Sequence, residues 1–201
     1  MVEPALYNDV GNGTVTVRGK IHQWYGVRFR RFPSMSGRSK QAFLDTYDKE
    51  HATTMRVLRA YPEEKLDLRP TPALKTAKEL VWVFVLECYL GAKVWRDEFK
   101  SGVPSGKPPE APESWSEILQ SVEKAYADFR ALIAAASLEA LEEDVHFMTA
   151  PKTLGPISRI NWLWFLLHDQ IHHRGQLSIY LRMAGGKLPS IYGPTADEPW
   201  I

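Results

Sequence analysis

The chain has 201 residues, which suits one domain with a substantial core, and its 44% hydrophobic and 24% charged content is typical of globular proteins. A formal net charge of +1 argues against a general attraction to nucleic acid or membranes, and no apolar run is long enough to span a bilayer. The single cysteine, Cys88, excludes an intrachain disulfide. Because the start shows no signal-peptide pattern, we expect a cytoplasmic protein.

Residues 1–38 form an expected N-terminal extension that differs in composition from the rest. Residues 1–40 hold seven basic and two acidic side chains, and "TVTVRGKIHQWYGVRF" alternates in the manner of a strand. The segment is therefore expected to be either flexible or a small hairpin. A basic, aromatic arm is also compatible with nucleic-acid binding, but the remainder of the chain is net acidic, so we expect no nucleic-acid partner.

From residue 39 the pattern becomes helical. The first predicted helix covers residues 39–61, where Leu44, Tyr47, His51 and Leu58 recur at helical spacing. After the proline-rich connection "PEEKLDLRPTP", a second helix is predicted over residues 73–99. Its middle, "LVWVFVLECYLGA", is apolar on nearly all sides, as expected of a helix packed against several neighbours.

Two further helices complete the predicted body. Ser114 and Glu117 have the spacing of a capping box at the start of the third helix. The fourth helix is predicted over residues 157–183, after the turn "TAPKTLGP". Four amphipathic helices without strands predict an all-α four-helix bundle over residues 39–201, preceded by the extension over residues 1–38.

The fourth predicted helix carries a cluster of histidines in "HDQIHHRGQ". His168 and His172 are spaced i, i+4, so they lie one turn apart on one helix face. Because the preceding turns are apolar, we expect both imidazoles to lie near the bundle interior, as two ligands of a divalent metal. The competing interpretation is a hydrogen-bonded structural pair. A catalytic site needs a third protein ligand.

The stretch "HDQIHHRGQLSIYLRMAGGKLPSIYGPTADEP", together with "PEEKLDLRP" and "KTAKELVW", resembles the DinB/YfiT-like family over residues 39–201. The resemblance implies a four-helix bundle, often dimeric, that holds a divalent metal with three histidines. Two of these would correspond to His168 and His172, with zinc or nickel as the expected metal. The resemblance also implies a metal-dependent transferase or isomerase that uses low-molecular-weight thiols.

The third histidine of that pattern is absent, because Val83 stands at its position and valine cannot bind a metal. Glu87, one turn further on the same helix face, is one candidate replacement. His51 is another, because antiparallel first and second helices would place it near Val83. Glu79 lies one turn in the opposite direction, close to the helix start.

The residues around the histidine pair have polar roles in this interpretation. Asp169 and His173 are expected to orient a metal-bound group or to carry a proton. Arg174 is expected to pair with a glutamate of the second helix, Glu79 or Glu87, or to bind an anionic substrate. Gln176 is expected to satisfy backbone groups.

These observations lead to one functional hypothesis and one alternative. The hypothesis is a DinB-like protein with a divalent-metal site, acting as a thiol transferase or hydrolase on a small molecule such as a low-molecular-weight thiol, as a homodimer. The alternative is a non-catalytic helical bundle that has lost its metal because Val83 replaces the expected histidine. The sequence leaves the choice open.

Overall fold

The structure, a computed structural model, describes residues 37–201. The extension expected over residues 1–38 lies outside the described residues, except for its last two residues, which begin the first helix. The α-helices, 3-10 helices (η) and strands, in chain order, are α1 (Gly37–Arg59), η1 (Glu63–Lys65), α2 (Ala77–Trp95), η2 (Glu98–Ser101), α3 (Trp115–Ala135), α4 (Leu138–Glu142), β1 (Asp144–Ala150), β2 (Thr153–Ser158) and α5 (Arg159–Met183).

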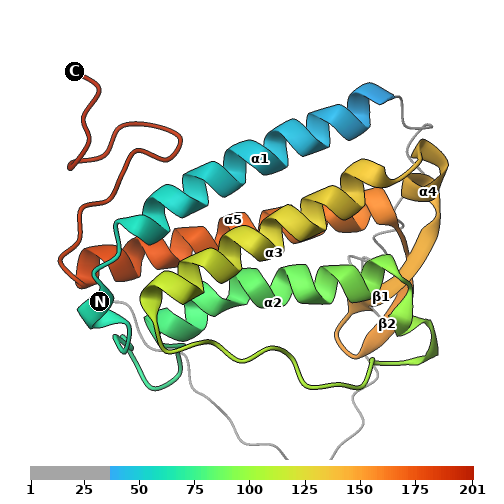
Figure 1. Cartoon of the computed structure of the whole chain (residues 1–201), viewed down its shortest axis with the longest axis horizontal. Helices are drawn as coiled ribbons and strands as arrows, with labels where there is room; N and C mark the ends of the chain where they lie inside the picture. The colour runs from blue at the N-terminus through green and yellow to red at the C-terminus, as the bar shows by residue number, and fades with distance from the viewer. Residues whose placement is uncertain (1–36) are drawn as a thin grey trace, which may run out of the picture. The chain divides into compact units, whose positions relative to one another are not determined.

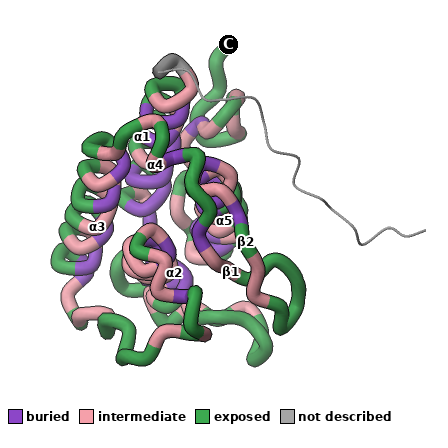
Figure 2. Tube along the Cα trace, turned by 90° about the vertical axis from the view of Figure 1, so that its right-hand side faces the viewer, coloured by how far each residue is buried: buried purple, intermediate pink, exposed green. Residues whose placement is uncertain are grey.

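The four long helices pack as a bundle, which confirms the predicted fold class. α1 and α2 each lie between α3 and α5, so they occupy opposite corners of the bundle (Figure 2). α1 and α5 run in one direction, and α2 and α3 run in the other (Figure 1). No helix within residues 37–201 is both long and apolar enough to cross a membrane.

The helix starts follow from local capping. Thr76 and Glu79 form a complete capping box at the start of α2, where each side chain bonds the backbone N–H of the other residue. Ser114 accepts a hydrogen bond from the backbone N–H of Glu117, which confirms the predicted start of α3. The long predicted second helix is shorter in the structure, because it ends at Trp95 and gives way to η2.

A β-hairpin lies between α4 and α5, so the expectation of a helical body without strands was wrong. β1 and β2 pair antiparallel, with Val145 opposite Ile157. These two residues are buried, and Phe147 packs edge-on against the ring of Trp162. Only one residue in each strand is fully buried. The alternation of apolar and polar residues is therefore too short to distinguish the hairpin from a loop.

A long linker returns the chain along the bundle between α2 and α3. Because both helices run in the same direction, residues 102–114 have to travel back past α2 (Figure 1). Trp82 of α2 holds this linker, since its indole N–H donates to the carbonyl of Pro109 at 2.8 Å.

Gly91 lets α2 approach its neighbours closely, because a Cβ there would lie 2.9 Å from the Phe129 ring.

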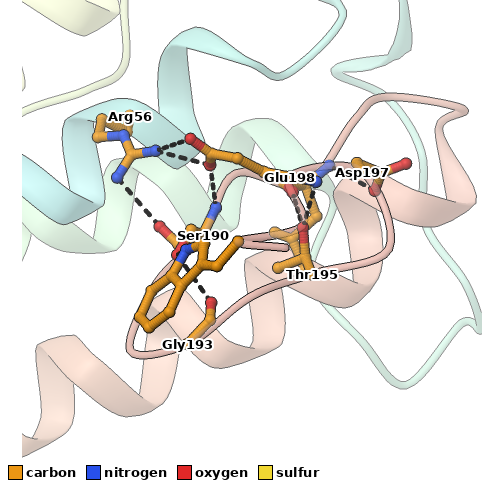
Figure 3. A network of polar contacts seen from close by, with 8 residues as sticks. Arg56, Ser190, Gly193, Thr195, Asp197 and Glu198 are labelled. Atoms are coloured by element: carbon orange, nitrogen blue, oxygen red, sulfur yellow. Dashed lines mark hydrogen bonds and ion pairs between the residues drawn. The ribbon is translucent and has the colours of Figure 1, made fainter.

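The residues after α5 fold back onto α1 as a tail. Arg56 of α1 pairs with Glu198 at 2.8 Å and donates to the Ser190 carbonyl at 3.1 Å (Figure 3). The Ser190 hydroxyl in turn donates to the Gly193 carbonyl at 2.7 Å and accepts from the Trp200 indole at 3.0 Å. Arg56 thus joins the tail to α1 at two points, and the Ser190 hydroxyl holds the tail together internally.

A buried ion pair joins α5, α1 and this tail. Arg174 is 1% exposed, and its Nη2 lies 2.7 Å from Oε2 of Glu50 on α1. The Tyr192 hydroxyl donates to the same Glu50 oxygen at 2.8 Å and accepts from Arg174. The expected pairing of Arg174 with a glutamate of α2 was therefore wrong, because α5 turns this side chain toward α1.

Replacement of Arg174 by methionine should destabilise the bundle strongly, because it leaves the Glu50 carboxylate buried without its counter-charge. We expect the free energy of unfolding in urea to fall by about 3 to 5 kcal/mol. The double variant Arg174→Met, Glu50→Gln should recover much of this loss, because no unpaired charge then remains in the core.

The exposed pair of Lys124 and Asp128 on α3 provides the control. Its side chains are 75% and 66% exposed, so Lys124→Met should change the free energy of unfolding by less than about 0.5 kcal/mol. A loss in Arg174→Met as small as in this control would contradict the structural role of the buried pair.

Candidate metal centre

Glu87 of α2 is a buried carboxyl group without a hydrogen-bond partner. The residue is 6% exposed, and neither side-chain oxygen makes a hydrogen bond within residues 37–201. Burial, together with the nearby negative charge of Asp169, raises the pKa of Glu87 to about 9. Burial of an unpaired polar group is costly, so its presence needs an explanation.

α5 brings Asp169 and His173 to this carboxyl group. The two residues are spaced i, i+4, so one helix face presents both. The Nε2 atom of His173 lies 3.4 Å from Oε1 of Glu87 and 3.6 Å from Oδ1 of Asp169. The three possible ligand atoms lie within 4.8 Å of one another. We call these three residues the α2–α5 group.

The α2–α5 group is closed on one side and open on the other. The side chain of Glu87 is 8% exposed and that of His173 is 19% exposed, whereas that of Asp169 is 43% exposed. A bound ion would therefore be held from the core by Glu87 and would remain accessible from the side of Asp169.

His168 and His172, the ligands expected from the sequence, lie outside the α2–α5 group. Both residues are exposed. The His168 ring lies against Trp164, with 6.2 Å between ring centroids, and His172 Nε2 bonds to the Gln176 amide at 2.9 Å. Their expected inward orientation was wrong, because the inward i, i+4 pair begins one residue later on α5. Their role as metal ligands stays a prediction.

Of the third ligands weighed from the sequence, the structure places Glu87 in the group. His51 stacks on Tyr126 of α3, with 3.6 Å between ring centroids and an interplanar angle of 2°. Burial lowers the pKa of His51 to about 4. α1 and α2 occupy opposite corners, and His51 lies against Tyr126 of α3 rather than in the α2–α5 group. Glu79 is exposed and closes the capping box at the start of α2.

The α2–α5 group fits a divalent cation. Carboxylate oxygens and an imidazole nitrogen are ligands of zinc, manganese and iron in proteins. A cation would give direct bonds to the Glu87 oxygens, which make no hydrogen bond within the described residues. It would also offset the repulsion between the two carboxylates, because a bound ion is the largest local charge in such a site.

Asp169 and His173 are the residues whose inward position the sequence did not reveal. Their i, i+4 spacing was a usable signal, and it is the same spacing that drew attention to His168 and His172. Glu87 was also visible as an isolated charge in an apolar helix. The sequence did not show how α5 is rotated about its axis, and that rotation brings Asp169 and His173 to Glu87.

The chain is similar to known proteins over most of its length. A family model described as the DinB family matches residues 35–200. An uncharacterized protein of Bacillus subtilis strain 168, YrdA, is 28% identical over 157 residues, which cover 78% of this chain and 89% of YrdA.

Solved structures share the fold. A DinB-like protein from Bacillus cereus ATCC 10987 superposes with a TM-score of 0.63 at 24% identity, covering 76% of this chain and 97% of that one. The DinB-like protein YjoA of Bacillus subtilis gives a TM-score of 0.57 at 14% identity, covering 75% and 97%. At these identities the likeness concerns the fold alone.

Replacement of Glu87 by glutamine should stabilise the metal-free protein. Between the ordinary glutamate pKa of 4.5 and the native value of about 9, the native state binds one more proton than the unfolded chain. The stability of the wild type therefore falls as the pH rises through this window, and glutamine removes this dependence. In chelator-treated protein we expect a gain on the order of 2 kcal/mol near neutral pH, measured by urea unfolding.

Glu79 on the same helix provides the opposite case. Its carboxylate is exposed, and the hydrogen bond from the Thr76 backbone lowers its pKa. Glu79→Gln should therefore not raise the free energy of unfolding at any pH. An unchanged or lower stability of Glu87→Gln throughout the window would contradict the cost assigned to the buried carboxyl group.

Proposed function

This chain belongs to the DinB family, and on that premise we propose that it binds a divalent metal ion at the α2–α5 group. We further propose that the ion serves a transfer or hydrolysis reaction on a small molecule. The sequence resemblance suggests a low-molecular-weight thiol as the substrate class.

The buried carboxyl group of Glu87 carries this proposal. A buried carboxyl group that makes no hydrogen bond could be replaced by an apolar side chain at little cost if its purpose were packing alone. Glu87 instead faces Nε2 of His173 at 3.4 Å, across the contact between α2 and α5. Ionisable groups with strongly shifted pKa values cluster at functional sites, which supports a ligand-binding role for this position.

The donor set differs from the three histidines that the sequence resemblance implies. Imidazoles suit zinc, nickel and iron, whereas carboxylates suit harder ions such as manganese. With Glu87 and Asp169 as two of three donors, manganese joins zinc and nickel as a metal to be tested.

The residues of the α2–α5 group would have different roles in such a site. A divalent ion lowers the pKa of a bound water or holds a thiol as its thiolate, which is the chemistry of hydrolysis and thiol transfer. Glu87 would hold the ion from the core. Asp169, whose side chain is 43% exposed, lies on the side from which a small molecule would approach.

Val83 supports a second candidate function. It is half-buried on α2, one turn before Glu87, and offers no donor atom. A family member that lost the metal with the histidine expected there would be a non-catalytic helical bundle. Metal binding by the wild-type protein separates the two functions.

Thermal unfolding with added metal tests the proposed site. At about 100 times the dissociation constant, a bound ion stabilises the native state by about 2.7 kcal/mol. For a protein of this size we expect the unfolding temperature to rise by about 5 to 10 °C. His173→Gln should abolish this rise, because it removes the imidazole of the α2–α5 group. Elemental analysis of dialysed wild type should show bound metal.

His168→Gln is the matched control, since the residue lies on the same helix but is exposed. This variant should keep the metal-dependent rise. If His168→Gln loses the rise and His173→Gln keeps it, the exposed histidines bind the metal and the α2–α5 group does not. If manganese, zinc and nickel all leave the wild type unchanged, the non-catalytic bundle is the better description.

A further inference from the structure

The side-chain amide of Gln176 contacts both adjacent histidines of α5. We propose that Gln176 is a positioning residue that keeps the proton of the neutral His173 ring on Nδ1. The Nε2 atom then presents its lone pair to Glu87 and Asp169. The purpose of this arrangement rests on the proposed metal site, whereas the arrangement itself does not.

The helix places the amide where it can bridge the two rings. Gln176 follows His172 by four residues and His173 by three, so all three side chains lie on adjoining turns of α5. Its Nε2 lies 2.9 Å from Nε2 of His172, and its Oε1 lies 3.3 Å from Nδ1 of His173. Gln176 therefore bonds to imidazoles and not to the backbone groups expected from the sequence.

The chemistry of the amide assigns the ring protons. An amide nitrogen can only donate a hydrogen bond, and an amide oxygen can only accept one. With the amide oriented as in the structure, Nε2 of His172 accepts, and Nδ1 of His173 carries the hydrogen that it donates to Gln176. A neutral imidazole has one such hydrogen, so Nε2 of His173 is left with a free lone pair.

That lone pair lies beside the two carboxyl groups of the α2–α5 group. His173 Nε2 is the atom that lies 3.4 Å from Oε1 of Glu87 and 3.6 Å from Oδ1 of Asp169. Metal-binding histidines commonly donate their other ring N–H to an oxygen atom, which fixes the tautomer and the ring orientation. Gln176 supplies that oxygen here.

A nearby carboxylate favours the opposite tautomer, in which Nε2 of His173 carries the proton. A proton on Nε2 of His173 would face the negative charge of the Asp169 carboxylate, whose Oδ1 lies 3.6 Å away. Such a proton would block Nε2 as a ligand. Loss of the Gln176 oxygen should therefore move the proton from Nδ1 to Nε2.

Nitrogen-15 NMR of the histidine rings tests this assignment on the metal-free full chain. Spectra recorded near pH 8 lie above the ordinary imidazole pKa of about 6.5. A protonated and an unprotonated ring nitrogen have well separated shifts, and His173→Gln identifies the resonances of His173. We expect a protonated Nδ1 in the wild type and a protonated Nε2 in Gln176→Leu.

Two variants separate positioning from packing. Gln176→Glu retains an oxygen acceptor for Nδ1 and should restore the wild-type tautomer of His173. His172→Leu removes the other partner of the amide and leaves the acceptor in place, so it should also keep the wild-type tautomer. A general disturbance of α5 would change the spectra of these two variants in the same way as those of Gln176→Leu.

Metal titration then connects the tautomer to the proposed site. Gln176→Leu should bind metal about 10- to 100-fold more weakly than the wild type, whereas Gln176→Glu should stay within a few-fold. A protonated Nε2 in the wild type, or a protonated Nδ1 retained in Gln176→Leu, would overturn the inference. If the expected tautomers are found but the wild type binds no metal, the positioning role stands and the proposed function fails.

Discussion

The ion pair between Arg174 and Glu50 helps to set the rotation of α5, and the geometry of the candidate site depends on that rotation. A guanidinium that is 1% exposed is accommodated only where a counter-charge and further acceptors surround it. Glu50 of α1 and the Tyr192 hydroxyl of the tail provide this environment. With Arg174 held toward α1, the residue before it, His173, faces α2, and His172 faces solvent.

Glu87 and Arg174 are two buried ionisable groups that the bundle treats in opposite ways. The guanidinium of Arg174 is bonded to α1 and to the tail. The carboxyl group of Glu87 has no hydrogen bond within the described residues. Because the bundle surrounds Arg174 with bonding partners, the lack of a hydrogen bond at Glu87 is not a general property of its core. Residues held at a cost to stability are typical of sites that await a ligand.

The helices were predictable from the sequence, but the rotation of α5 was not. Periodicity located the four long helices, and capping chemistry located the start of α3 at Ser114. The run "INWLWFLL" before the histidines is apolar at successive positions, so it does not single out one buried face. The sequence therefore predicted that His168 and His172 face inward, whereas Asp169 and His173, one residue later, do so. In the structure, the buried contact of Arg174 with α1 is consistent with the later register.

The order of helices around the bundle has a consequence for folding. Helices that are consecutive in the chain do not form antiparallel hairpins here, since α1 and α2 lie at opposite corners and α2 and α3 run in parallel (Figure 1). Contacts between neighbouring helices therefore join segments that are distant in sequence or separated by a long linker. This raises the contact order above that of an up-and-down bundle, so the chain should fold more slowly than a simple bundle of equal length. The α2–α5 group is one such contact, because its residues come from helices that precede and follow α3 in the chain.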